Sequence, residues 1–295
     1  MMPSPTHFVP IIEPVKVTLN GLTTAMQRMM DCSQCFALVL NPDDGDFRRT
    51  RKDLLSEIPL LTEHQQSWIP AFLYKEADRD SIRSVIDEKR LGEVMLIFKN
   101  GVDMQNEGIT SLIGVDAVRY VVNGNAGSRI NTRRLIQQFP GKTHIRLDEN
   151  FHERTKNADY LQREDEDYTE QHLFYAGDGF QGISDYTCLP KVMADGGMLP
   201  YAVAIHLIYQ GQDAVVFVHH FVSDTNDDQS NVQGKFFEAA SKVRDFFQQR
   251  GDSTPAVEEI VQLIHDNRFP GLGYLKKLSI KNNIQLMNQI MESER

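Results

Sequence analysis

Short apolar runs alternate with amphipathic stretches along the first half of the chain, and this alternation restricts the fold most. Six runs have strand character, at residues 8–12, 36–40, 68–74, 94–98, 118–122 and 143–147. Runs that are apolar at nearly every position are typical of strands whose two faces are both covered by helices. The sequence therefore predicts six neighbouring parallel strands in one sheet, joined by right-handed helical crossovers.

The stretches between these runs have helical periodicity, for instance over residues 19–30 and 78–89 and up to about Phe139. So many strand–helix units favour a closed barrel over an open doubly wound sheet. The predicted fold class is α/β, a TIM-barrel-like series of parallel units. At 295 residues, the whole chain fits a single barrel-like domain.

The pattern changes after residue 148. A polar, acidic insertion without clear periodicity covers about 149–176. Two apolar runs, 201–209 and 214–222, flank the turn residues 210–213 and predict an antiparallel β-hairpin. Helical patterns fill most of the C-terminal region 231–295, over residues 232–250, 255–267 and 274–293.

Composition narrows the class of protein. Apolar residues make up 41% of the chain, and the net charge is −10. A diffuse acidic surface argues against broad nucleic-acid binding. No apolar run approaches the ~20 residues that span a bilayer, so we expect no membrane association. The odd number of cysteines, without a signal sequence, predicts a reducing compartment and a cytoplasmic protein.

Cys32 and Cys35 have the spacing of a redox motif or of half a zinc site. Only Cys188 is left to complete a second pair, and the motif ends a predicted helix rather than opening one. We interpret the two cysteines as reduced thiols at a helix end.

Polar side chains follow the predicted strands, where parallel α/β folds bind their ligands. The candidate acid–base residues are Glu13, Lys75 and Asp148, and the candidate ligand-binding residues are Lys16, Asn41, Lys99 and Asn123; Asp43 lies on the same predicted rim. Taken singly, each of these residues is also common in ordinary loops and turns. Lys75 and Lys99 carry the functional hypothesis, because each directly follows an apolar strand, where a small turn residue would serve.

The loop from Asn123 to Arg129 is the candidate anion site. Gly124 and Gly127 permit backbone N–H groups to converge before a helix, and Arg129 offers a fork-shaped cation. The alternative is a flexible loop with Ser128 near the helix N-cap.

Two apparent motifs are excluded. Residues 177–182 fit G-x-G-x-x-G but do not open a helix after a first strand. Ser184 lacks the second glycine of a nucleophile elbow.

The second half of the chain supplies further candidates. We predict that Ser184, Asp185, Tyr186, His206 and Asp224 gather at one end of the barrel, with Asp185 and His206 as catalytic residues and Tyr186 as a ligand-binding residue. Asp185 beside His206 would raise the pKa of that imidazole. The set of His206, His219, His220, Asp185 and Asp224 leaves a metal site open, although His219 and His220 point to opposite strand faces. We predict no metal and assign no cofactor.

Several segments resemble the Beta protein family, a group of bacterial and phage proteins with little assigned biochemistry. They are Ile11–Lys16, Ser184–Tyr186, Gly196–Gly197, Pro200–His206, His220–Asp224 and Phe269–Tyr274. Members usually carry an aromatic and basic segment ahead of the first strand, where this chain has only residues 1–7. The resemblance implies a barrel-like α/β fold and a setting in mobile elements or phage defence.

Two functional hypotheses follow. The first is an enzyme, of hydrolase or phosphodiesterase type, acting on a phosphorylated or nucleotide-like ligand. The alternative is a non-catalytic recognition or scaffold component of a defence or regulatory assembly, bound to a protein partner. Whether the chain is catalytic, its substrate and its oligomeric state are left open.

Overall fold

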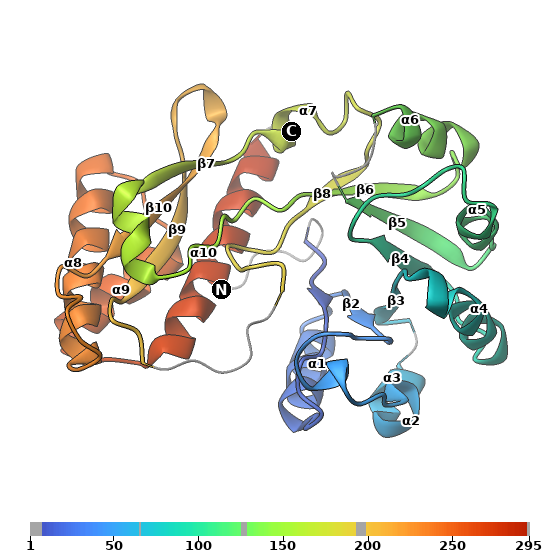
Figure 1. Ribbon diagram of the computed structural model, residues 1–295, viewed down its shortest axis with the longest axis horizontal. Coiled ribbons are helices and arrows are strands. Elements are labelled where there is room, and N and C mark those ends of the chain that lie inside the picture. Colours follow the sequence, from blue (N-terminus) through green and yellow to red (C-terminus); the bar gives the residue numbers. More distant parts are fainter. Residues whose placement is uncertain (1–7, 65, 125–128, 193–198, 294–295) are drawn as a thin grey trace. The chain divides into compact units, whose positions relative to one another are not determined.

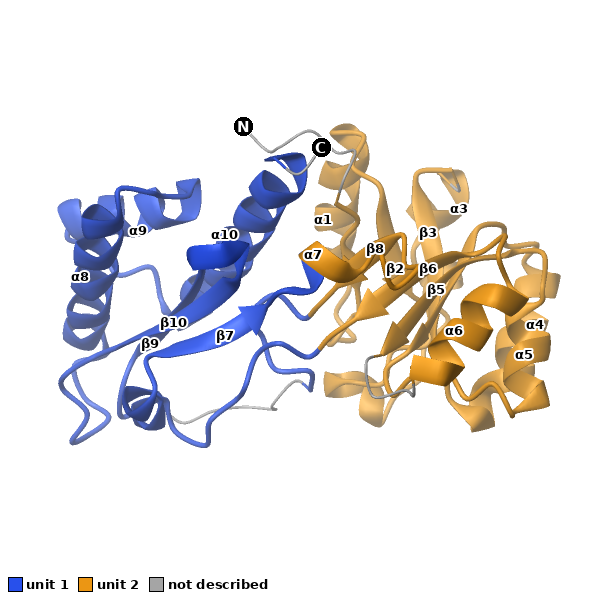
Figure 2. Cartoon of the chain, turned by 90° about the horizontal axis from the view of Figure 1, so that it is seen from above, with its two compact units in different colours: residues 1–3, 149–172, 186–295 blue, residues 4–148, 173–185 orange. Residues whose placement is uncertain are grey.

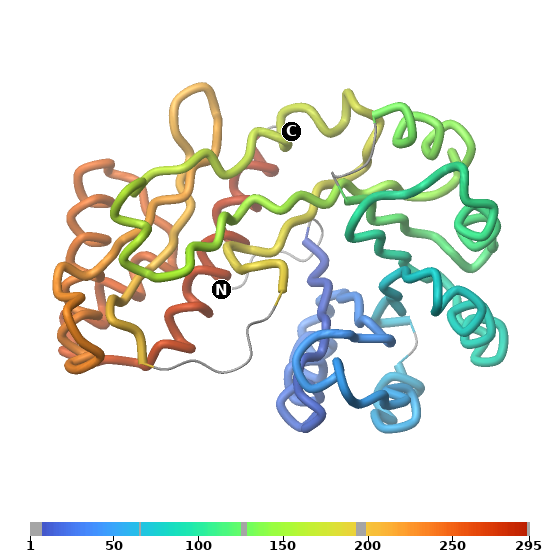
Figure 3. Tube along the Cα trace, in the orientation of Figure 1, coloured from blue at the N-terminus to red at the C-terminus, as the bar shows by residue number. Residues whose placement is uncertain are grey.

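The computed structural model describes residues 8–64, 66–124, 129–192 and 199–293. The chain forms two compact units (Figure 2). Unit 2 comprises residues 4–148 and 173–185, and unit 1 comprises residues 1–3, 149–172 and 186–295. The chain leaves unit 2 after Asp148, re-enters it at Leu173 and leaves it again after Asp185. Figure 3 traces the course of the chain by colour from the N-terminus to the C-terminus.

Unit 2 contains one parallel sheet of seven strands, in the order β1-β2-β3-β4-β5-β6-β8 (Figure 1). The strands are β1 (Ile11–Ile12), β2 (Phe36–Val39), β3 (Trp68–Leu73), β4 (Val94–Phe98), β5 (Val118–Gly124), β6 (Thr143–Leu147) and β8 (Gly182–Ser184). The helices are α1 (Asn20–Asp31), α2 (Leu54–Glu57), α3 (Pro59–Glu63), α4 (Arg79–Glu88), α5 (Glu107–Ile113), α6 (Arg129–Gln138) and α7 (Gln171–Phe174), the last of which crosses the boundary between the units.

The prediction of six parallel neighbours is confirmed. Each consecutive pair from β1 to β6 is parallel, with Phe36 opposite Trp68 and Val122 opposite Ile145 as examples. The sheet curls into a half-barrel, with β1 and β8 at the two ends of its strand order (Figure 1). The structure shows a half-barrel, whereas the number of strand–helix units in the sequence favoured a closed barrel.

The core of unit 2 explains why the strands are apolar at every position. All residues of β2, β3 and β4 are buried. One face of β4 packs Val94, Leu96 and Phe98 against Ile82 and Ile86 of α4. Two covered faces leave little room for polar residues within these strands, so polar side chains occur after the strands end.

Unit 1 contains an antiparallel sheet in the order β7-β10-β9, with three long helices. Its elements are β7 (Asp165–Thr169), β9 (Ala204–Gln210), β10 (Val216–Val222), α8 (Val232–Arg250), α9 (Pro255–His265) and α10 (Leu272–Ser293). The predicted hairpin is confirmed as β9 and β10, whose register places His206 opposite His220. The predicted C-terminal helices are also confirmed, and residues 232–250 match α8 at both ends.

Two of the strands, β7 and β8, were not predicted from the sequence. The stretch predicted as a polar insertion includes β7, which pairs with β10 and buries Glu166 and Tyr168. β8 begins at the end of the glycine-rich residues 177–182; it has three residues and extends the parallel sheet beside β6. No helix in the described parts of the chain has the length and apolar character needed to span a membrane.

Candidate functional site

Four charged side chains meet beyond the ends of four consecutive strands of unit 2. Glu13 follows β1, Asp43 follows β2, Lys75 follows β3 and Lys99 follows β4. We call these four residues the rim cluster. The parallel sheet explains the arrangement, because the carboxyl ends of parallel strands lie along one edge.

Ion pairs and one main-chain hydrogen bond join the rim cluster. Nζ of Lys99 lies 2.9 Å from Oε2 of Glu13 and 3.7 Å from Oδ1 of Asp43. Nζ of Lys75 pairs with Oδ2 of Asp43. The main-chain N–H of Asp43 donates to Oε1 of Glu13 at 3.1 Å. Glu13 and Lys99 therefore connect across the ends of the two strands that separate β1 from β4.

The rim cluster is accessible to a solute. The side chains of Lys75 and Asp43 are 45% and 32% exposed, and those of Lys99 and Glu13 are 23% and 19% exposed. Groups at this depth are partly desolvated, so their mutual electrostatic interactions are stronger than those of surface pairs.

The two carboxyl groups have pKa values shifted in opposite directions. Burial raises the pKa of Glu13 and outweighs the opposing effects of Lys99 and of the main-chain N–H of Asp43, and a side-chain hydrogen bond with Asp43 raises it further. Burial alone would raise the pKa of Asp43, but hydrogen bonds from Lys75 and Glu13 and the charge of Lys99 lower it. The proton therefore occupies Glu13 in preference to Asp43, and the two groups titrate as a pair.

Asn41 holds the strand ends together. Its Nδ2 donates to the carbonyl oxygen of Leu73 at 2.8 Å, and its Oδ1 accepts from the N–H of Leu73 at 2.9 Å. The amide thus takes the place of a further β2 residue in the hydrogen-bond ladder with β3. The chain leaves the sheet at this point and turns toward Asp43.

Asn123 likewise binds main chain near the end of β5. It is 3% exposed, and its Oδ1 accepts from the N–H of Val102 at 2.9 Å. Its Nδ2 lies 3.3 Å from Oγ1 of Thr132 on α6. These contacts hold the loop that begins at Lys99. In the structure both asparagines bind main-chain groups, and their predicted ligand-binding role stays a prediction.

Gly124 and Gly45 permit close approaches around the rim cluster. A Cβ atom on Gly124 would lie 2.5 Å from the carbonyl oxygen of Lys99. A Cβ atom on Gly45, whose φ is +57°, would lie 2.2 Å from the carbonyl oxygen of Val15. Both positions require glycine, because a side chain would displace the neighbouring main chain.

Three other predicted residues lie elsewhere on the sheet edge. Lys16 pairs with Asp46 at 3.1 Å. Asp148 is 5% exposed and accepts from Nε of Arg146 at 2.7 Å, while its Oδ1 has no hydrogen-bond partner within the described parts of the chain. Arg129 begins α6 and is exposed, and residues 125–128 of the predicted anion loop, Gly127 included, lie outside the described residues.

The predicted grouping around Asp185 involves both units. Ser184 and Asp185 belong to unit 2, whereas Tyr186, His206 and Asp224 belong to unit 1. This grouping stays a prediction. The partner that the structure gives His206 is His220, and the two Nδ1 atoms lie 2.7 Å apart.

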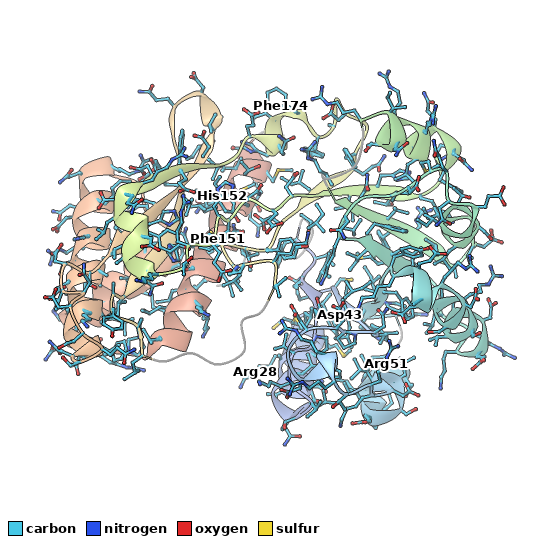
Figure 4. All side chains as sticks on the ribbon, viewed as in Figure 1. Arg28, Asp43, Arg51, Phe151, His152 and Phe174 are labelled. Carbon is cyan, nitrogen blue, oxygen red and sulfur yellow. The ribbon has the colours of Figure 1, made fainter. Side chains whose placement is uncertain are left out.

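The histidine pair lies in an aromatic cluster of unit 1. The ring of Tyr160 is 4.6 Å from that of His206 and 4.4 Å from that of His220, and Phe151 lies 5.0 Å from His206 (centroid distances; Phe151 is labelled in Figure 4). Burial lowers the pKa of His206 to about 3 and that of His220 to about 4. This is opposite to the raised pKa that an aspartate neighbour would give His206, and it keeps both rings neutral.

A buried carboxylate on β7 completes this part of unit 1. The side chain of Glu166 is 2% exposed and pairs with Arg154 and, at 3.1 Å, with Nδ1 of His152. Sequence reasoning missed it within an acidic run. In the structure exposed Asp165 and Asp167 alternate with buried Glu166 and Tyr168, but the sequence Asp-Glu-Asp has no alternation of polar and apolar residues and so carried no signal for Glu166.

Among the residues that the structure describes, neither the cysteines nor the histidines form a metal centre. Cys32 is exposed at the end of α1, and Cys35 is half-buried, with a pKa that burial raises. Such a thiol is a poor nucleophile. Among the described residues, no three His, Cys, Asp or Glu side chains are grouped closely enough to hold a metal ion.

Comparison with known proteins gives no family assignment, because no protein-family model matches the chain and no curated protein is significantly similar to it.

Proposed function

We propose that the rim cluster is the acid–base site of an enzyme, of hydrolase or phosphodiesterase type, acting on a phosphate-bearing or nucleotide-like small molecule. The observation that carries the proposal is the opposite shift in the pKa values of Glu13 and Asp43 beside two lysine side chains. Two carboxyl groups whose pKa values are pushed apart can supply one acid and one base. Lysine ammonium groups bind phosphate oxygens as point charges.

The proposed reaction assigns one task to each side chain. Asp43 accepts a proton from a water molecule whose oxygen attacks phosphorus. Glu13 donates its proton to the leaving oxygen as the P–O bond breaks. Lys75 and Lys99 exchange their carboxylate partners for phosphate oxygens and balance the negative charge of the transition state. Transfer of the proton from Asp43 to Glu13 then restores the starting state.

The place of the rim cluster in the fold supports this proposal. Ligands of parallel α/β folds bind beyond the carboxyl ends of the strands. Main-chain contacts made by Asn41 and Asn123 hold the loops that carry Asp43 and Lys99. Rigid support of this kind is what positioned acid–base groups need.

We extend the proposal to the setting that the sequence resemblance implies, a cytoplasmic, TIM-barrel-like member of the Beta protein family that acts in phage defence. The parallel half-barrel of unit 2 is compatible with that resemblance.

The test is turnover of a panel of phosphomonoesters and phosphodiesters by the full chain. We expect Glu13→Gln and Asp43→Asn to lower kcat at least 100-fold, and Lys99→Met to raise KM as well. Lys281→Met is the matched control, because Lys281 forms a lysine–glutamate pair with Glu259 at 2.6 Å and is 36% exposed in unit 1. Equal activity of the Glu13 and Asp43 variants and the wild type would refute the proposal. Phosphate binding without turnover would favour the recognition role instead.

A further inference from the structure

A basic loop follows the rim cluster along the chain. Residues 48–52 contain four cations in five positions: Arg48, Arg49, Arg51 and Lys52. Buried side chains fix both ends of this loop, Phe47 before it and Leu54 after it, which are 4% and 1% exposed. The ends are therefore held while the arginines between them reach solvent.

Two arginines of the basic loop are attached beside the rim cluster. Arg48 donates through Nε and Nη2 to Oδ1 of Asp44 at 3.2 and 2.6 Å. Arg51 donates through Nη1 and Nη2 to Oδ1 of Asp78, both at 3.3 Å. Asp44 is the neighbour of Asp43 in sequence. The N–H of Asp78 donates to the carbonyl oxygen of Lys75 at 3.0 Å.

The carboxylates are buried and the guanidinium of Arg51 is not. Asp44 and Asp78 have side chains only 12% and 10% exposed, whereas that of Arg51 is 82% exposed. A guanidinium has five N–H donors, and Asp78 accepts from two of those of Arg51. A buried carboxylate thus orients a cation that keeps further donors directed at solvent. Figure 4 labels Asp43 and Arg51, both in the part of unit 2 that holds α1 to α3.

We propose that the basic loop is a second anion subsite beside the rim cluster and that the ligand carries two anionic groups, as a polyphosphorylated small molecule does. This inference rests on the proposed function, because it takes the rim cluster as the site of the first phosphate. Arg51 and Arg49 bind the second anionic group. With Glu13 protonated, the rim cluster sets two lysine charges against the one negative charge of Asp43, and the first phosphate uses that single excess charge. In the loop, Arg48, Arg51 and Lys52 each pair with a carboxylate, so the attraction for a second anionic group comes from Arg49 and from the N–H donors of Arg51 that Asp78 does not use.

The experiment measures binding by calorimetry at fixed ionic strength. The probes are inorganic phosphate, tripolyphosphate and adenosine 3′,5′-bisphosphate, and the variants are Arg51→Gln and the double variant Arg49→Gln/Arg51→Gln. We expect either variant to weaken binding of the two multiply charged probes by about tenfold or more, the effect of losing a charge-assisted hydrogen bond. Binding of inorganic phosphate should stay within about twofold of wild type.

Arg83→Gln is the matched control, because Arg83 is an exposed arginine of the same unit that pairs with Asp87 at 2.7 Å on α4. Its affinities should equal those of the wild type. Wild-type affinity of the loop variants for the multiply charged probes overturns the inference, as does a failure of the wild-type protein to bind any probe. Loss of turnover in Glu13→Gln with normal binding by Arg51→Gln refutes the subsite and leaves the proposed function intact. Arg51-dependent binding without turnover by any form supports the subsite and refutes the enzyme.

Discussion

The amide group of Asn41 makes both hydrogen bonds that a continued β2 strand would make to Leu73, at 2.8 and 2.9 Å. A single side chain thus extends the ladder between β2 and β3 by one position while the chain itself departs toward the rim cluster. The loop that carries Asp43 therefore depends on a side chain for its position.

Replacement of Asn41 tests this dependence. Asn41→Ala removes both hydrogen bonds and leaves the N–H and C=O of Leu73 unpaired, which should lower the free energy of unfolding by about 1–3 kcal/mol. Asn41→Asp should destabilise as well, because a carboxylate has no donor for the carbonyl oxygen of Leu73. Urea unfolding measures both effects. Asn20→Ala, at an exposed position in α1, is the control and should change stability by less than about 0.5 kcal/mol.

Gly124 gives a prediction about the position of Lys99. Gly124→Ala places a Cβ atom 2.5 Å from the carbonyl oxygen of Lys99, so the main chain must shift. We expect a loss of about 1–3 kcal/mol in stability and weaker phosphate binding. Gly182→Ala is the matched control in the same sheet, because the nearest atom to its Cβ would be a side-chain carbon of Ile145 at 3.9 Å. Equal stability of the two variants would contradict the close packing at Gly124.

The raised pKa of Glu13 predicts a pH dependence of stability. Its folded-state pKa lies above the usual value of 4.5, so the folded protein holds this proton more tightly than the unfolded chain does. The contribution of Glu13 to stability is therefore complete below pH 4.5 and is lost as the pH rises through the raised pKa. Glu13→Gln should remove this fall, measured as the difference between wild type and variant in urea unfolding from pH 4 to 7. A difference that is constant over that range would contradict the shift.

The histidine pair predicts the opposite dependence. His206 and His220 have folded-state pKa values of about 3 and 4, below the usual 6.5. As the pH falls, these histidines take up protons in the unfolded chain before they do so in the folded protein. The free energy of unfolding of unit 1 should therefore fall below pH 6.5, by roughly 1 kcal/mol per pH unit for each ring. Amide hydrogen exchange of β9 and β10 at pH 7 and 5 reports the loss.

Variants separate the pair from the other histidines. The double variant His206→Leu/His220→Leu should lose most of the acid sensitivity of β9 and β10. His265→Gln changes a histidine whose side chain is 82% exposed and should keep that sensitivity. Unchanged acid sensitivity in the double variant would assign the effect to other groups.

The parallel strands from β1 to β6 were predictable because burial on both faces leaves a continuous apolar run in the sequence. β8 has three residues that follow a glycine-rich stretch, and β7 contains three acidic residues, so neither has such a run. β7 is nevertheless a strand, and its buried Glu166 is held by an ion pair with Arg154 and a hydrogen bond with His152. These partners lie 12 and 14 positions away in the sequence, so the pairing is not visible in the local pattern of the strand.

The site was predictable to a similar extent. The grouping of Glu13, Lys75 and Lys99 in the candidate site was predictable because residues that follow parallel strands share one edge of a sheet. Their partners were not, since the contacts of Lys99 with Glu13 join residues 86 positions apart. The main-chain partners of Asn41 and Asn123 were not predicted either, because those groups become available only where neighbouring strands end.

The chain crosses between the two units after residues 148, 172 and 185, and this has a consequence for biosynthesis. β7 leaves the ribosome well before β10, the strand with which it pairs, and β8 joins the parallel sheet only after β7 has been made. Neither unit can thus be completed while the other is wholly untranslated. A stop codon after Asp148 would release a sheet whose β6 edge lacks its last strand and is open to pairing with another chain. Premature termination at this point should favour aggregation rather than a free half-barrel.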